Sequence, residues 1–155
     1  MRRKDREILN YEKMIEIMKS CDCCRLGLID ADAAYILPLN FGYEEVNGNL
    51  YLYFHGASKG KKIDLIEKQL SVSFEMDRKH QLVEGDIACK YSYQYQSIMG
   101  KGNIELVSDF EEKVHGLRMI MSHYSSKEDW EFNSEHVNMV SVMRLHVKEW
   151  SCKEH

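Results

Sequence analysis

The stretch "YLYFHGASKGKK", residues 51–62, decides how the chain is interpreted. It begins as an apolar, aromatic run typical of a buried strand, and this run ends at His55. Lys59, Lys61 and Lys62 then crowd the start of a segment with helical spacing. Lysines at that position oppose the helix dipole, whose positive end is the N-terminus. A bound anion would offset this conflict, so the cluster suggests a phosphate site.

Two simpler interpretations stay open for the same residues. The lysines can be an ordinary solvated cluster, and His55 can be a structural histidine at a strand end. Tyr51 and Tyr53 alternate with apolar residues, which indicates cross-strand packing more than cofactor contact. A position directly after a strand end and a glycine nevertheless favours ligand binding, and a histidine there can donate a proton near neutral pH.

The flanking sequence is organised as strands joined mainly by hairpins. Asn47-Gly48 is a strong hairpin signal, and Pro38 predicts a break, an edge position or a bulge in its strand. Six or seven strands are predicted, over residues 25–30, 35–46, 49–56, 71–77, 136–150 and one or two segments of 85–107. Three helices are predicted, after the capping residue Asn10, over 59–70 and after the capping box Ser108–Glu111. This order argues against a doubly wound α/β fold and predicts a mainly β (α+β) barrel with helices outside it.

Composition places the chain among ordinary globular proteins. It has 155 residues, 44% of them hydrophobic and 30% charged, which predicts a single domain over 1–155. A formal charge of −4 disfavours binding to nucleic acid or to an anionic membrane. No run approaches the roughly 20 apolar residues of a membrane span, and the charged start does not resemble a signal peptide. Together with an odd number of cysteines, five, this predicts a cytoplasmic protein.

A second informative segment is "YSYQYQSIMGKG", residues 91–102. Its tyrosines, at 91, 93 and 95, share one strand face, and its glutamines and serine offer uncharged hydrogen-bonding groups. Gly100 and Gly102 bracket Lys101, which predicts a bulge or a close backbone approach. An exposed amphipathic strand and a subunit interface are the alternatives for this tyrosine stripe.

Other chemistries find little support. The run "CDCC", residues 21–24, lacks the second spaced pair that a zinc site needs, so we predict no metal site and buried free thiols. His115 and His123 lie eight residues apart, near one helix face. Signatures of a serine triad, a P-loop or a dinucleotide-binding glycine motif are missing from the sequence.

Three motifs, in this order and spacing, resemble those of the pyridoxamine 5′-phosphate oxidase-like FMN-binding split barrels. They are "PLNFGYE" (38–44), "LYFHGASKGKKIDLI" (52–66) and "YQYQSIMGKGNIELVSDFEEK" (93–113). Within this family the chain most resembles the nitroimidazole-resistance (Nim) branch of nitroreductase-like flavoproteins. The resemblance spans residues 1 to 150, nearly the whole chain.

The resemblance implies a six-stranded split barrel with flanking helices, and a homodimer with FMN at its interface, touched by both chains. The matching positions are assigned as follows: Leu39 and Asn40 to the isoalloxazine ring; Tyr53, Phe54 and His55 to the flavin lining; Ser58, Lys61 and Lys62 to the phosphate; Tyr95, Gln96 and Ser97, from across the interface, to ribityl and phosphate. Many family members carry Arg where this chain has Gln96, so a bidentate phosphate partner is lost. Either FMN affinity is weaker here or Lys101 compensates.

The implied activity is an FMN-dependent oxidoreductase. NAD(P)H or another reductant would supply electrons, a small oxidised compound such as a nitroaromatic would receive them, and His55 would donate a proton. The alternative is a flavin or haem binder without turnover, with histidines 55, 115 and 123 as conceivable haem ligands. A third reading, pyridoxamine 5′-phosphate oxidation itself, ranks low because the arginines form no cluster in the sequence.

Overall fold

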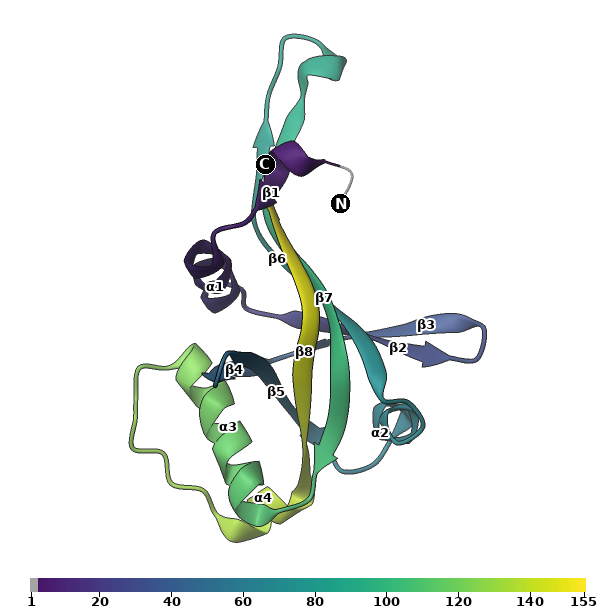
Figure 1. The fold of residues 1–155 in the computed structure, drawn as a ribbon, viewed down its shortest axis with the longest axis vertical. Coiled ribbons are helices and arrows are strands. Elements are labelled where there is room, and N and C mark those ends of the chain that lie inside the picture. The colour runs from purple at the N-terminus through teal and green to yellow at the C-terminus, as the bar shows by residue number, and fades with distance from the viewer. Residues whose placement is uncertain (1–2) are drawn as a thin grey trace.

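The computed structural model describes residues 3–155, so residues 1 and 2 of the predicted domain lie outside it. Eight antiparallel strands form one sheet in the order β3-β2-β6-β7-β8-β5-β4, and β1 pairs with β8 (Figure 1). The strands are β1 Glu7–Ile8, β2 Cys24–Asp30, β3 Ala33–Leu39, β4 Phe41–Val46, β5 Asn49–Ala57, β6 Ser71–Val83, β7 Ser92–Val107 and β8 Val140–Glu154. The helices are α1 Tyr11–Lys19, α2 Lys61–Ile66, α3 Phe110–Tyr124 and α4 Ser134–Met139, with short 3₁₀ turns at Lys4–Arg6 and Ala88–Lys90.

The predicted mainly β architecture with outer helices is confirmed, but the strand count is eight instead of six or seven. One extra strand arises because the strand predicted over 35–46 divides at Asn40 into β3 and β4. Pro38 lies in β3, an edge strand, where a missing backbone N–H is tolerated. The second extra strand is the two-residue β1, which is too short to show a pattern in the sequence.

Two local sequence signals are confirmed by the backbone. Asn47 and Gly48 join β4 to β5, and both have positive φ values, 52° and 76°, as a two-residue hairpin of this type requires. The register of β7 against β8 shifts between Lys101 and Gly102, which is the bulge that the two glycines predict.

The main core fills the space between the curled sheet and α1. Asn10 caps α1 by accepting a hydrogen bond from the N–H of Lys13 at 2.8 Å, as predicted. The buried face of α1 packs on apolar side chains that the strands turn inward. The largest fully buried members of this core are Phe41, Phe54, Met18, Leu26, Leu28, Leu52, Met76, Ile98, Met143 and Leu145.

Two helix boundaries and one strand boundary differ from the prediction. The helix predicted over 59–70 is only α2, because Ile63 and Ile66 are buried while Leu70 is 64% exposed and adds no packing. Asp109, instead of Ser108, caps α3 by accepting from the N–H of Glu112 at 2.9 Å. The strand predicted over 136–150 begins at Val140, because Asn133 caps the preceding residues into α4.

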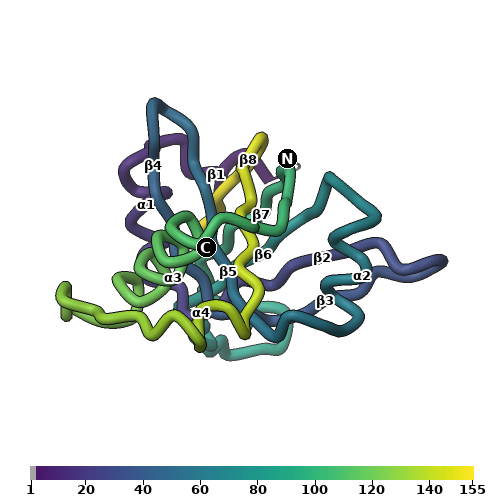
Figure 2. The backbone as a smooth tube through the Cα atoms, turned by 90° about the horizontal axis from the view of Figure 1, so that it is seen from below, coloured from purple at the N-terminus to yellow at the C-terminus, as the bar shows by residue number. Residues whose placement is uncertain are grey.

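Helix α3 packs closely against one face of the sheet, over β4 and β5 (Figure 2). Gly42 makes this approach possible, because a Cβ atom there would lie 2.3 Å from the backbone of Met119. Gly116 has the same effect on the helix side, where a Cβ atom would lie 2.8 Å from the ring of Tyr53. We call this side of the sheet the helix-covered face.

The outer surface of β2, β3, β6 and β7 is built differently, and we call it the bare face. Ile36 and Met99 are 63% and 59% exposed on it. With Ala34 and Ser73 they line a shallow hollow of about 360 Å³. No helix packs over this hollow in the part of the chain that the structure describes (Figure 1). Its lining combines apolar and small side chains with the ion-paired Arg25 and Glu75.

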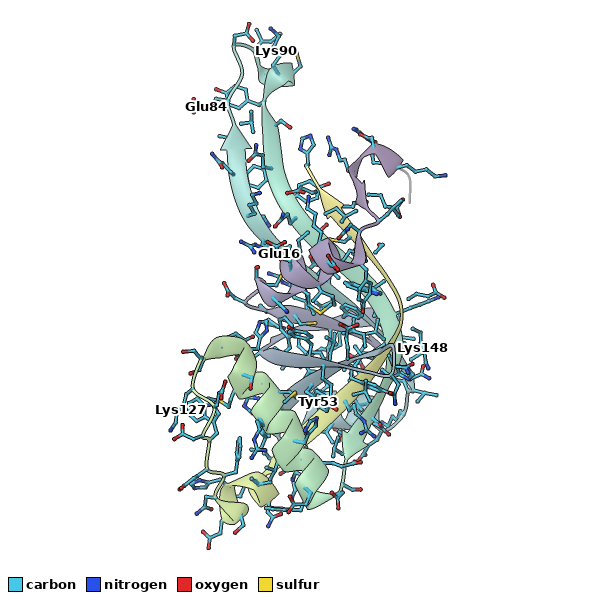
Figure 3. The ribbon with its side chains drawn as sticks, turned by 60° about the vertical axis from the view of Figure 1, so that its left-hand side comes forward. Glu16, Tyr53, Glu84, Lys90, Lys127 and Lys148 are labelled. Atoms are coloured by element: carbon cyan, nitrogen blue, oxygen red, sulfur yellow. The ribbon has the colours of Figure 1, made fainter. Side chains whose placement is uncertain are left out.

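A hairpin arm, residues 78–92, extends from the barrel because β6 runs six residues beyond its predicted end. Glu84 and Lys90 mark the far end of this arm in Figure 3. Its apolar side chains are unusually exposed, between 37% and 54% for Leu82, Val83, Ile87 and Tyr91. Within residues 3–155, no helix has both the length and the apolar character needed to cross a membrane.

Candidate functional site

The lysine turn, residues 58–62, leaves the end of β5 and leads into α2. Ser58, Lys59 and Gly60 are exposed, and Gly60 has a φ of 119°, which favours glycine. The carbonyl of Gly60 accepts the first hydrogen bond of α2, from the N–H of Ile63 at 2.8 Å. Because α2 has only six residues, its dipole is small, and the attraction for an anion comes mainly from the lysine charges.

The three lysines of this turn have different partners. Lys61 forms an ion pair with Asp30 at 2.5 Å, and its ammonium lies 5.1 Å from the ring centroid of Tyr35. The hydrogen bond and the charge of Asp30 raise the pKa of Lys61. Lys59 and Lys62 make no ion pair with any described residue, so two uncompensated cations remain at the turn.

Asp30 and Tyr35 are site neighbours that the sequence analysis missed. Both belong to the β2–β3 hairpin, where Leu28 pairs with Tyr35 and Asp30 with Ala33. A hairpin could have been suspected from "IDADAAY", residues 29–35, but its position beside α2 depends on the tertiary fold.

Lys62 folds back over the end of β5. A Cβ atom at Gly56 would lie 2.0 Å from the Lys62 ammonium, so the glycine leaves the space that this side chain occupies. The positive charge therefore lies beside His55, the next residue along β5. Partial burial, and then the charge of Lys62, lower the pKa of His55.

The structure brings Asn40 to the same strand end as His55. Phe41 pairs with Phe54 at the start of the β4–β5 ladder, so the preceding residue, Asn40, lies at the end of that ladder beside His55. Asn40 is exposed and Leu39 is half-buried against the main core. One end of the barrel thus brings together the predicted ring contacts Leu39 and Asn40, the predicted proton donor His55 and the lysine turn.

Tyr53 and Phe54 belong to this strand end, but their side chains point into the protein. Phe54 is fully buried in the main core, and Tyr53 is 2% exposed beneath α3 (Figure 3). Tyr53 donates its hydroxyl hydrogen to Glu44, whose second oxygen lies 2.8 Å from Nε2 of His115. Burial and this hydrogen bond raise the pKa of Tyr53 well above its ordinary range. Any contact of these two residues with a ligand is therefore restricted to their backbone.

Within one chain, the lysine turn lies far from the predicted ribityl and phosphate contacts Tyr95, Gln96 and Ser97. His55 pairs with Val142 of β8, and Ser97 pairs with Lys153 of the same strand. The 11 residue steps from Val142 to Lys153 correspond to about 35 Å along an extended strand. One FMN molecule cannot bridge that distance, so the two halves of the predicted site lie apart within the chain.

Gln96 and Lys101 are already paired inside the protein. Gln96 is 7% exposed, and its amide donates to Glu154 at 2.8 Å. Lys101 forms an ion pair with Glu149 at 3.1 Å. In this arrangement Gln96 is not free to take the place of the arginine that the family resemblance implies, whereas Lys101 keeps an exposed ammonium with spare donors and Ser97 lines a surface hollow.

His115 and His123 have structural partners, and three of the cysteines are buried. His115 contacts Glu44, and His123 lies 2.8 Å from the carbonyl oxygen of Cys21 and against the ring of Phe41. Cys21 and Cys24 are buried free thiols, and burial raises the pKa of Cys21 to about 12. Within residues 3–155, no three or more metal-binding side chains are grouped to hold an ion.

Comparison with known proteins gives a coherent picture. A profile of the pyridoxamine 5′-phosphate oxidase family matches residues 11–154. A solved structure of a proposed 5-nitroimidazole antibiotic resistance protein from Bacteroides thetaiotaomicron is 30% identical, covers 96% of this chain and 86% of its own, and superposes with a TM-score of 0.83. The comparison with curated proteins gives no match.

Two further structures are similar in fold. The flavocytochrome Anf3 from Azotobacter vinelandii is 22% identical over all of this chain and 72% of its own, with a TM-score of 0.82. A FAD- and haem-binding protein from Mycobacterium smegmatis is 14% identical over 96% of this chain and 73% of its own, with a TM-score of 0.81. At these identities the likeness concerns the fold alone, and it agrees with the predicted split barrel.

Proposed function

The chain belongs to the pyridoxamine 5′-phosphate oxidase family, and from that premise we propose that it is an FMN-dependent oxidoreductase. It acts as a homodimer, takes electrons from NAD(P)H and reduces a small aromatic compound such as a nitroaromatic. The observation that carries this proposal is the strand end where two unpaired lysines, His55 and Asn40 meet. The relative named for 5-nitroimidazole resistance supports the substrate class.

The residues present at the lysine turn fit a phosphate group. Lys59 and Lys62 carry uncompensated charge, and Ser58 adds a hydroxyl on the same exposed turn. Lys61 has three N–H donors, so it can keep its contact with Asp30 and still donate to a phosphate oxygen. Charge-assisted hydrogen bonds of this type are the strong ones in proteins.

A partner chain would complete the site. The segment at Tyr95 and Ser97 lies about 35 Å from His55 along β8 in one chain, by the strand spacing, so a second copy would have to supply it. The bare face offers exposed apolar side chains beside the Arg25–Glu75 ion pair, a surface that such a two-fold contact could bury. The exposed apolar side chains of the arm add to the surface available for burial.

When bound, FMN supplies the electron-transfer chemistry, and the protein supplies binding, orientation and electrostatics. His55 would hold a proton close to the ring. Burial and the charge of Lys62 lower its pKa, which favours the uncharged imidazole, a group that can accept or donate a hydrogen bond there. Asn40, at the end of the same ladder, would orient the ring through its side-chain amide.

A comparison of FMN with riboflavin tests the binding step, because the two differ only in the phosphate. FMN should bind about tenfold more tightly or better. Lys62→Met should weaken FMN binding by about tenfold and leave riboflavin binding unchanged. The matched control is Lys68→Met, an exposed lysine just beyond α2 that forms no ion pair with any described residue.

Stopped-flow mixing with NADPH or NADH tests the catalytic step. Rapid bleaching of the flavin, followed by reoxidation with a nitroaromatic, supports the enzyme. Binding without reduction would favour the non-catalytic flavin binder. A haem-binding role would instead require haem uptake through His55, since His115 and His123 are held by protein partners. Protein that takes up no added FMN at all would contradict the proposal.

A further inference from the structure

A cavity beside His55 is not lined by any other residue of the predicted cofactor site. It measures about 260 Å³ and lies where α3, the segment 125–133 and α4 meet the end of β5. Its lining residues are His55, Leu117, Glu131, Phe132, Asn133, His136, Val137 and Val140. Lys127 marks the segment that closes this side of the molecule in Figure 3.

The cavity lies on the opposite face of β5 from the lysine turn. Side chains alternate along a strand, so His55 and Tyr53 share the face that points to α3, whereas Gly56, under Lys62, belongs to the other. A ligand in the cavity would therefore contact His55 without competing with a phosphate bound at the lysine turn.

The walls are held in place by contacts that leave the cavity open. Asn133 uses its side-chain oxygen to cap α4, accepting from the N–H groups of Glu135 and His136. The guanidinium of Arg118 lies 5.9 Å from the ring centroid of Phe132 and supports that ring. Val137 is 2% exposed and anchors α4, while His136 keeps an exposed side chain at the cavity.

The lining chemistry selects the kind of ligand. Leu117, Phe132, Val137 and Val140 offer apolar surface, and two imidazoles offer hydrogen bonds. The lining includes one carboxylate, Glu131, and no lysine or arginine. Burial and the charge of Lys62 lower the pKa of His55, which favours its uncharged form. Because the lining itself holds a carboxylate and no cation, it favours an uncharged ligand over an anion. The volume is below that of sites for drug-sized molecules, so a single aromatic ring fits.

We propose that this cavity binds a small uncharged aromatic compound, with His136 as a second hydrogen-bonding residue besides His55 and Phe132 as an apolar wall. The inference rests on the proposed function in one respect, because the bound compound is then the aromatic substrate that is reduced. His136 and Phe132 become residues that determine substrate specificity, and both come from a part of the chain outside the three family motifs.

Nuclear magnetic resonance of the histidine side chains tests this proposal on flavin-free and flavin-loaded protein. Nitrobenzene should shift the imidazole signals of His55 and His136 saturably, and 4-nitrobenzoate, its anionic counterpart, should bind at least several-fold more weakly. His136→Asn and Phe132→Ala should each weaken nitrobenzene binding about three- to tenfold. His146→Asn, on β8 outside this cavity, is the matched control.

The outcomes separate this inference from the proposed function. FMN binding should be unchanged in His136→Asn, and its circular dichroism should match that of the parent protein. Nitrobenzene shifts at both histidines support the cavity even if the chain proves not to turn over. If neither form of the protein shows shifts at these histidines, or if both variants bind nitrobenzene normally, the inference is wrong although FMN binding stands.

Discussion

The helix-covered face and the bare face of the same sheet differ in how completely their side chains are packed. Under α3, Gly42 and Gly116 allow close contact, and Tyr53, Glu44 and His115 satisfy one another's hydrogen bonds. On the bare face, by contrast, large apolar side chains such as Ile36 and Met99 are more than half exposed. Soluble monomers rarely leave contiguous apolar surface of this kind uncovered.

This difference shows which surface is packed within one chain and which is left for association with a second chain. The helix-covered face is stabilised by contacts within the chain, so its substitutions should act on folding. The bare face and the arm leave large apolar side chains exposed, so substitutions of those side chains should act on association and on the cofactor site that association completes.

The largest effect should follow from filling the space at Gly42, which allows α3 to pack closely on β4. In Gly42→Ala the new methyl group would meet the Met119 backbone at 2.3 Å and push the helix away. We expect a loss of about 3 kcal/mol in the free energy of unfolding, as for other overpacked sites. Urea denaturation measures it. Gly27→Ala is the control, since its nearest neighbour lies 3.8 Å away, and equal stability of the two variants would contradict the account.

The next effect concerns the bare face. Met99→Glu places a charge on an exposed apolar site that would be buried in the dimer, and we expect dimer dissociation to become easier by about 2 kcal/mol. The unfolding stability of the monomer should stay unchanged. Light scattering after size-exclusion chromatography measures the dimer fraction. Glu128→Lys, an exposed change far from the bare face, should leave it as it is.

A smaller effect should follow from removing one hydroxyl beneath α3. Tyr53→Phe deprives the partly buried Glu44 of a donor, and we expect a loss of about 1 kcal/mol in the free energy of unfolding. Tyr51→Phe is the control, because the Tyr51 hydroxyl makes no hydrogen bond to any described residue. Matching stabilities for the two variants would show that the Glu44 cluster adds nothing.

The smallest effect is a shift in the titration midpoint of His55. Partial burial and Lys62 hold the pKa of His55 below its unfolded value, so protonation favours the unfolded chain. Its contribution to stability is present above about pH 6.5 and is lost as pH falls below that value. Lys62→Met should raise the His55 midpoint in an NMR titration, although not to the full unfolded value, while Lys59→Met should leave it unchanged.

Local signals in the sequence predicted the parts of the fold that depend on local chemistry. Asn47-Gly48 requires positive φ values whatever surrounds it, and Gly100 and Gly102 marked a bulge for the same reason. The length of α2 was overestimated, because only the tertiary fold decides that Leu70 finds nothing to pack against. Burial of Tyr53 under α3 could not be read from the strand pattern either.

The candidate site was predictable where its residues are close in sequence. The turn after β5 brings Ser58, Lys61 and Lys62 together by itself. Pairing of Gln96 with Glu154, 58 positions away, depends on the β7–β8 register and left no local signal. The cavity at His136 depends on α4, which was predicted as part of a strand, and it could not have been found from the sequence.

The central claim is that the lysine turn of one protomer and the Tyr95–Ser97 segment of its partner bind FMN together. Analytical ultracentrifugation of FMN-loaded protein, followed by flavin absorbance, tests it most directly. We expect the flavin to sediment with a dimer at one FMN per chain, and to be released when Met99→Glu produces monomers. Flavin that stays bound to the monomer, or a stable dimer that carries none, would contradict the account.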